Sequence, residues 1–149
     1  MFRGLQVFVS GIALAGFTLA GTAVASAQEP AKAAPVMALD GDAAVITILI
    51  KPDKTADFES VIAKYKEALG KSDNAVRKTQ LAGMTFFKSP TAVQGNIPYI
   101  IVVNPVVKGE EYDITRVITE VFPVEVQAVY AKYKDSFAGR GISVLNKIP

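Results

Sequence analysis

The most informative stretch of this sequence is PYIIVVNP, residues 98–105. It has the length of a β-strand, it is apolar at nearly every position, and β-branched side chains dominate it. This composition is typical of a strand at the centre of a sheet, where both faces are buried. The two prolines predict where the strand ends, because proline cannot donate a ladder hydrogen bond.

Three other segments have strand character. AAVITILI (43–50) is a second nearly continuous apolar run, and MTFFK (84–88) is a short strand. Turn residues separate MTFFK from the central stretch, so the two segments are expected to form a hairpin. The last segment, ISVLNKI (142–148), is half polar, which favours a position at the edge of the sheet.

Apolar residues at helical spacing predict the helices between these strands. One helix is expected from about residue 54 to residue 69, where Gly70 can end it. A short polar helix is expected within residues 72–82. A longer apolar pattern runs from Asp113, a suitable N-cap, to Phe137, and Pro123 breaks or kinks it.

The order strand, helix, strand, strand, helix, strand predicts an α+β domain over residues 43–149, with the ferredoxin-like βαββαβ plan and an antiparallel sheet. In that plan the helices cover one face of the sheet. Alternation nevertheless gives both faces apolar side chains, with Val45 and Leu49 on one face of their strand and Ile100 and Val102 on one face of theirs. Exposing about six such side chains would forfeit on the order of 10 kcal/mol. We therefore expect a homodimer in which two sheets pack face to face.

The first 27 residues have the pattern of a signal peptide. Arg3 lies in a short basic region, an uncharged run follows, and Ala25-Ser26-Ala27 matches a cleavage motif, so cleavage is expected between Ala27 and Gln28. An uncleaved membrane anchor is the alternative, because the uncharged run is long enough to span a bilayer. Residues 28–42 show neither helical nor strand periodicity and are expected to form a flexible tail. These features predict export to the periplasm or medium, with no membrane attachment after cleavage.

Composition excludes several functions. The chain has no His, no Cys and no Trp, which rules out zinc sites built on Cys or His, haem ligation by those residues, iron–sulfur clusters, Cys nucleophiles and Ser-His-Asp triads. We expect no metal and no cofactor. The net charge of +2 falls to +1 when Arg3 leaves with the leader, which gives no argument for a nucleic-acid partner.

The pattern of residues 43–148 resembles the dimeric α/β-barrel superfamily, whose best-known members are similar to antibiotic-biosynthesis monooxygenases. The phrases NPVVKG (104–109), with Tyr112, and FPVEVQ (122–127) also resemble those of uncharacterised exported bacterial proteins. The superfamily resemblance implies a pocket between helix and sheet, where such enzymes oxidise quinol-like aromatics or degrade haem using Trp, Asn and His. Because Trp and His are absent, the haem-degrading pattern does not apply, and the quinol pattern lacks its usual Trp.

Four residues are the candidates for such a pocket: Phe86, Tyr99, Asn104 and Tyr112. Asn104 follows the central strand and could point into the pocket, although Asn at a strand end more often satisfies loop backbone. Two hypotheses remain. The first is an exported dimer without enzymatic activity that binds a small apolar or aromatic ligand, or interacts with a partner. The alternative is a cofactor-independent monooxygenase or isomerase acting on a small aromatic substrate. Convergence of the four side chains on one enclosed cavity would favour the alternative.

Overall fold

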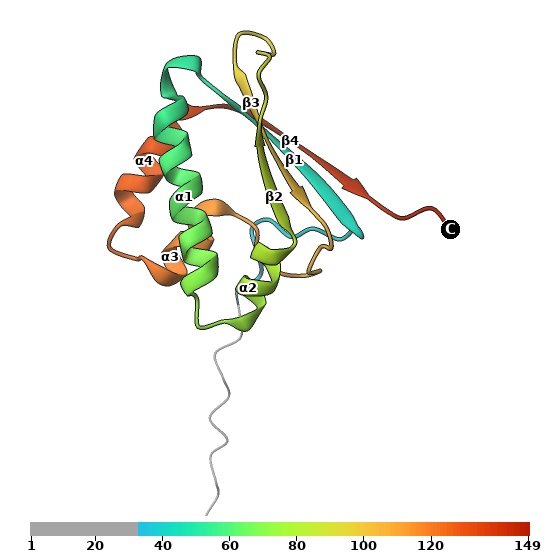
Figure 1. The fold of residues 1–149 in the computed structure, drawn as a ribbon. Coiled ribbons are helices and arrows are strands. Elements are labelled where there is room, and N and C mark those ends of the chain that lie inside the picture. The colour runs from blue at the N-terminus through green and yellow to red at the C-terminus, as the bar shows by residue number, and fades with distance from the viewer. Residues whose placement is uncertain (1–32) are drawn as a thin grey trace, which may run out of the picture. The chain divides into compact units, whose positions relative to one another are not determined.

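Four strands and four α-helices follow one another in the computed structural model, which describes residues 33–149 (Figure 1). The predicted signal peptide, its cleavage site and residues 28–32 of the predicted tail lie outside these residues. A 3₁₀ turn (Pro52–Lys54) precedes α1. The elements are β1 (Ala43–Ile50), α1 (Thr55–Lys71), α2 (Ala75–Ala82), β2 (Met84–Lys88), β3 (Ile97–Val103), α3 (Ile114–Val121), α4 (Val126–Ser136) and β4 (Phe137–Leu145).

The four strands form one antiparallel sheet in the order β2-β3-β1-β4. The two apolar runs of the sequence, β1 and β3, lie side by side at its centre, and β4 lies at an edge. This confirms the prediction of an α+β domain with an antiparallel sheet. The arrangement is compatible with the ferredoxin-like plan, to which the chain adds the short helix α2 and a break between α3 and α4.

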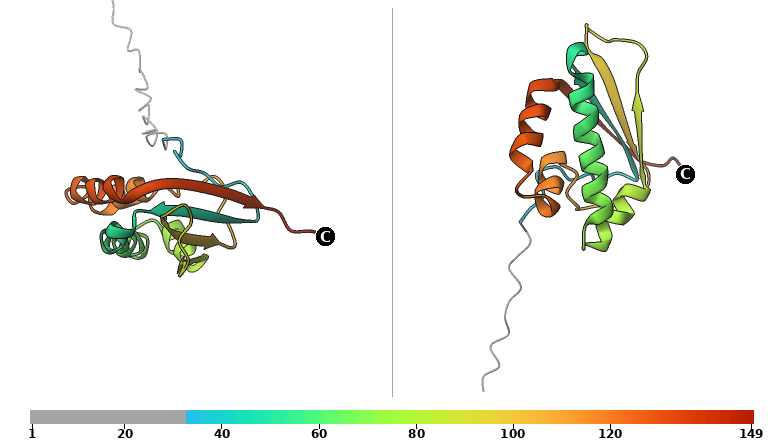
Figure 2. Two further views of the ribbon diagram at one scale, coloured as in Figure 1. Left: turned by 90° about the horizontal axis from the view of Figure 1, so that it is seen from above. Right: turned by 60° about the vertical axis from the view of Figure 1, so that its left-hand side comes forward.

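The two faces of the sheet have different environments. The helices lie on one side, as the right-hand view of Figure 2 shows. On that inner face the core side chains are almost fully buried; from β1 and β3 they are Ala44, Ile46, Ile48, Ile50, Tyr99, Ile101 and Val103. No helix covers the outer face within residues 33–149. Val45, Leu49, Ile100 and Val102 remain partly exposed there, and Phe87 of β2 is 51% exposed.

Two strand boundaries differ from the sequence prediction. β3 begins one residue before Pro98, whose carbonyl accepts a hydrogen bond from the Ser89 N–H just past the end of β2. In an antiparallel strand the nitrogen and the carbonyl of one residue point to the same neighbouring strand, so the nitrogen of Pro98 faces β2. The absence of an N–H there costs no hydrogen bond between β1 and β3. β4 spans Phe137–Leu145 rather than 142–148, because pairing along the whole of β1 overrides the low strand propensity of Gly139 and Gly141.

The helix boundaries are close to those predicted. α1 continues through Gly70 to Lys71, so Gly70 does not end it. Asp113 caps α3, since its carboxylate accepts hydrogen bonds from the N–H groups of Thr115 and Arg116 at 3.0 Å. A break at Phe122 and Pro123 separates α3 from α4, as the proline predicts. No helix among the described residues is long and apolar enough to cross a membrane.

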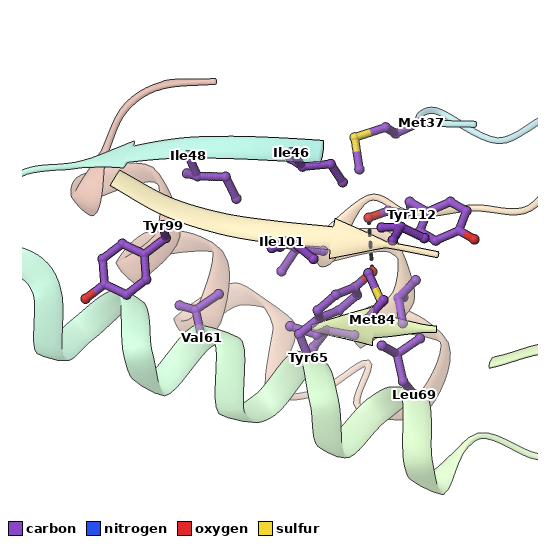
Figure 3. Close-up of a cluster of buried hydrophobic side chains, with 14 of the residues drawn as sticks. Met37, Ile46, Ile48, Val61, Tyr65, Leu69, Met84, Tyr99, Ile101 and Tyr112 are labelled. Carbon is purple, nitrogen blue, oxygen red and sulfur yellow. Dashed lines mark hydrogen bonds between the residues drawn. The ribbon is translucent and has the colours of Figure 1, made fainter. Parts of the chain in front are cut away.

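The segment before β1 differs from the flexible tail expected there. Residues 33–42 belong to the same compact unit as the domain, and Met37 and Leu39 are buried in its core. Figure 3 shows Met37 next to the start of β1, near Tyr112. The Tyr112 N–H donates to the Met37 carbonyl at 2.9 Å. Two apolar residues spaced two apart were the only signal for this docking, and the Ala, Pro and acidic residues around them obscured it.

A buried polar cluster fixes this segment and the loop before α3. The Glu111 carboxylate accepts hydrogen bonds from the N–H groups of Val36, Met37 and Asp113. Arg77 of α2 is 1% exposed; its guanidinium donates to the Glu111 carbonyl at 3.0 Å and holds the Glu120 carboxylate of α3 with two nitrogens. Gln80 donates to the same carbonyl. Within residues 33–149 no buried side-chain polar atom lacks a partner.

This cluster gives stability a pH dependence. Burial would raise the pKa of Glu111, but the N–H groups of Asp113, Val36 and Met37 outweigh it and hold the pKa below the ordinary value of 4.5. When a carboxyl group has a lower pKa in the folded protein than in the unfolded chain, its full contribution to stability is present at pH values above the unfolded-state pKa. The contribution is lost as the pH falls through the folded-state pKa.

We therefore expect Glu111→Gln to lower the unfolding free energy at pH 7 by about 1–2 kcal/mol. The difference from the unsubstituted protein should shrink as the pH falls below about 4.5. Urea denaturation at several pH values measures it. Asp40→Asn, at an exposed position of the same segment, should change little at any pH. If the difference in unfolding free energy between Glu111→Gln and the unsubstituted protein did not change with pH, the stabilising role of the ionised Glu111 carboxylate would be contradicted.

Candidate ligand-binding pocket

A cavity of about 200 Å³ opens between α1 and the β2–β3 hairpin. Its walls are mostly aromatic and aliphatic, and one acidic and one basic side chain join them. The lining residues are Glu59 and Ile62 from α1, Phe86, Phe87 and Lys88 from β2, and Tyr99, Ile100 and Ile101 from β3. A concave apolar site with a few convergent polar groups is the usual form of a small-molecule site.

Local structure places these side chains together. Glu59 and Ile62 are three residues apart on α1, so they share one side of the helix. Alternation along β2 gives Phe86 and Lys88 the same face, opposite Ile101 and Tyr99 of β3. Phe58 of α1 packs edge-on against the Tyr99 ring, with centroids 4.8 Å apart, and fixes that ring.

Three polar groups meet at one side of the pocket. Oε1 of Glu59 accepts a hydrogen bond from the Tyr99 hydroxyl at 2.7 Å and another from Nζ of Lys88 at 2.8 Å. The Lys88 Nζ also lies 5.6 Å from the centre of the Tyr99 ring. The Tyr99 side chain is nearly buried, whereas about half of the Glu59 and Lys88 side chains is exposed. Glu59, Lys88 and Tyr99 together form the Glu59 cluster.

Each group of the Glu59 cluster shifts the ionisation of the others. Hydrogen bonds from Lys88 and Tyr99 hold the pKa of Glu59 below its ordinary value. The hydrogen bond to Glu59 raises the pKa of Lys88, and burial together with the hydrogen bond to Glu59 raises the pKa of Tyr99. Near neutral pH the cluster therefore presents one negative charge, one positive charge and a neutral phenol.

The structure brings together two of the four predicted site residues. Phe86 and Tyr99 both line the pocket. Asn104 is exposed beyond the end of β3, where its backbone N–H donates to the Gly83 carbonyl at 2.8 Å. Tyr112 is buried at the far end of the core from Tyr99 (Figure 3), and its hydroxyl accepts the Val107 N–H at 2.8 Å. Neither Asn104 nor Tyr112 lines the pocket.

Sequence reasoning missed Glu59 and Lys88. Glu59 belongs to the charged face of α1, which reads as a solvated surface, and Lys88 ends a short strand. The available signal was the alternation in MTFFK, which puts Lys88 on the same face as Phe86. Arg77 takes no part in the pocket, because it is buried in the core, where its guanidinium donates two hydrogen bonds to the Glu120 carboxylate.

Two larger hollows run along α1 and α4, with volumes of about 290 and 560 Å³. Their walls carry no aromatic side chain, and several of their charges pair within the protein, as Lys64 does with Glu125 at 2.9 Å. Within the described part of the chain, no group of three or more acidic, His or Cys side chains is placed to hold a metal ion. The pocket beside the Glu59 cluster is therefore the best-formed candidate site.

Comparisons with known proteins add no assignment. The sequence matches no protein-family model, and neither the curated proteins nor the solved structures include one with significant similarity to it. Function is therefore inferred from the geometry of the pocket and of the sheet.

Proposed function

We propose that this protein is an exported homodimer that binds a small apolar or aromatic ligand in the pocket between α1 and the β2–β3 hairpin. One observation carries the ligand proposal: aromatic and aliphatic side chains line a partly open pocket whose charged and hydroxyl groups are confined to the Glu59 cluster. An engineered apolar cavity of about 150 Å³ binds benzene, so about 200 Å³ accommodates one ring with a short substituent.

The outer face of the sheet supports the dimer proposal. Val45, Leu49, Ile100, Val102 and Phe87 form an apolar surface that no helix covers within residues 33–149. Burying such side chains is favourable by up to about 1.5–3 kcal/mol each, and less for those already half-buried. A second copy provides a complementary apolar sheet about a two-fold axis. With this arrangement the protein would be of the dimeric α/β-barrel type.

Export rests on the leader pattern of residues 1–27, and cleavage before Gln28 would release the protein from the membrane. The periplasm and the external medium are both compatible with this proposal. Docking of Met37 and Leu39 leaves eight residues, 28–35, between the cleavage site and the first residue held by Glu111.

No observation favours the monooxygenase or isomerase alternative. That alternative depended on four side chains meeting in one cavity, and Asn104 and Tyr112 lie outside the pocket. The remaining pair, Phe86 and Tyr99, includes one ionisable group, whose hydroxyl is already engaged with Glu59. We therefore propose binding without catalysis.

Filling the pocket tests the ligand proposal. We expect saturation-transfer NMR to detect toluene and benzyl alcohol bound to the protein, and Ile62→Trp to abolish the signal because the indole occupies the cavity. Ile142→Trp places the same side chain at a partly exposed apolar position of β4, outside the pocket, and should retain binding. Equal signals from the two variants, or no signal from the unsubstituted protein, would refute the proposal.

A further inference from the structure

The unused hydrogen-bonding capacity of the Glu59 cluster indicates what kind of ligand the pocket takes. Oε1 of Glu59 accepts both hydrogen bonds of the cluster, whereas Oε2 accepts none from residues 33–149. The Lys88 ammonium has three N–H groups: one donates to Oε1 of Glu59 at 2.8 Å, and the ammonium also interacts with the Tyr99 hydroxyl, which leaves a further N–H for a ligand. The pocket therefore offers an acceptor and a donor next to each other.

The two charges restrict the ligand further. Glu59 and Lys88 both line the cavity, and their charged atoms are 2.8 Å apart. A ligand carboxylate that approaches Lys88 also approaches the negative charge of Glu59. A ligand cation that approaches Glu59 meets Lys88 in the same way. A neutral ligand avoids both repulsions.

We infer that the ligand is a neutral, mainly apolar molecule that carries a hydrogen-bond donor and an acceptor side by side, as a primary carboxamide or a lactam does. Its N–H donates to Oε2 of Glu59, its carbonyl accepts from Nζ of Lys88, and its apolar part lies against Phe86, Ile62 and the Tyr99 ring. This inference rests on the proposed ligand-binding function and names the ligand class for the same pocket.

Four probes of nearly identical shape separate the contributions of charge and hydrogen bonding. Benzamide has a donor and an acceptor, acetophenone only an acceptor, benzoate is an anion and benzamidine is a cation. At neutral pH and fixed ionic strength, NMR titration should give benzamide a dissociation constant about fivefold lower than each of the other three. We expect no larger difference between the dissociation constants, because Glu59 and Lys88 are about half exposed and solvent weakens their interactions with a ligand.

Two substitutions should reverse the charge preference in opposite directions. Glu59→Gln leaves Lys88 unopposed, so benzoate should become the preferred charged probe. Lys88→Met leaves Glu59 unopposed, so benzamidine should become preferred. Lys78→Met is the matched control: Lys78 is exposed on α2, outside the pocket, so both charges of the cluster remain and the order of the four probes should not change. Circular dichroism checks that each variant is folded.

The possible results separate failure of the carboxamide inference from failure of the proposed ligand-binding function. The predicted order with both reversals supports the inference. If the probes bind equally, or a charged probe binds most tightly, while Ile62→Trp still abolishes binding, the carboxamide assignment is overturned and the pocket stands. If none of the four probes binds at millimolar concentration and toluene does not bind either, both the proposed function and this inference are refuted.

Discussion

Arg77→Met should lower the unfolding free energy by about 3 kcal/mol, the largest effect that we expect from a single substitution in this domain. The guanidinium is 1% exposed and contacts three parts of the chain: Gln80 on its own helix, the Glu111 carbonyl in the loop before α3, and Glu120 on α3. Methionine keeps much of the apolar volume but leaves the side-chain amide oxygen of Gln80 without its donor.

The expected loss is at the low end of the range of about 3–5 kcal/mol for breaking a buried ion pair. Glu120 is 39% exposed and can turn to water, and the Glu111 carbonyl keeps its hydrogen bond from Gln80. Lys78→Met is the matched control, since Lys78 is an exposed neighbour on the same helix and should change stability by less than about 0.5 kcal/mol. Equal urea midpoints for the two variants would contradict a structural role for Arg77.

Val102→Glu should convert the proposed dimer into a monomer and raise its dissociation constant at least about 100-fold. Val102 lies on the outer face of a central strand, between Val45 of β1 and Thr85 of β2. In a monomer, a glutamate at this partly exposed position is hydrated. In a face-to-face dimer it is desolvated within the apolar interface, with no cationic partner on the outer face of β1 or β3.

Sedimentation velocity at micromolar concentration measures this change. Val124→Glu makes the same substitution at a residue that is 93% exposed, before α4, and should leave the dimer intact. A monomeric unsubstituted protein, or a Val102→Glu variant that remains a dimer, would refute packing through the outer face. Circular dichroism separates loss of the dimer from loss of the fold.

The parts of the fold that the sequence predicts well are those set by local patterns. Each of the runs 43–50 and 84–88 becomes a strand with the predicted bounds, because continuous or alternating apolar residues have few other ways to be buried. Asp113 caps its helix as its side chain predicts. By contrast, Gly139 and Gly141 lie inside β4 because of their pairing with β1, a contact between distant segments that local propensity cannot indicate.

The candidate site was predicted only in part, for the same reason. Phe86 and Tyr99 were found because they are aromatic residues on predicted strands. Glu59 is 40 residues from Tyr99 in sequence, and only the packing of α1 against the hairpin joins them. Tyr112 is drawn into the core by the docked segment at Met37, which sequence periodicity did not reveal.

Isoleucine-methyl NMR during a benzamide titration reports directly on whether the pocket between α1 and the β2–β3 hairpin binds a ligand. Saturable shifts are expected at the methyl groups of Ile62 and Ile101, whose side chains line the pocket on the helix-covered side of the sheet, and none at Ile142 or Ile148. Absence of shifts at millimolar benzamide and toluene, or shifts confined to Ile142 and Ile148, would contradict it.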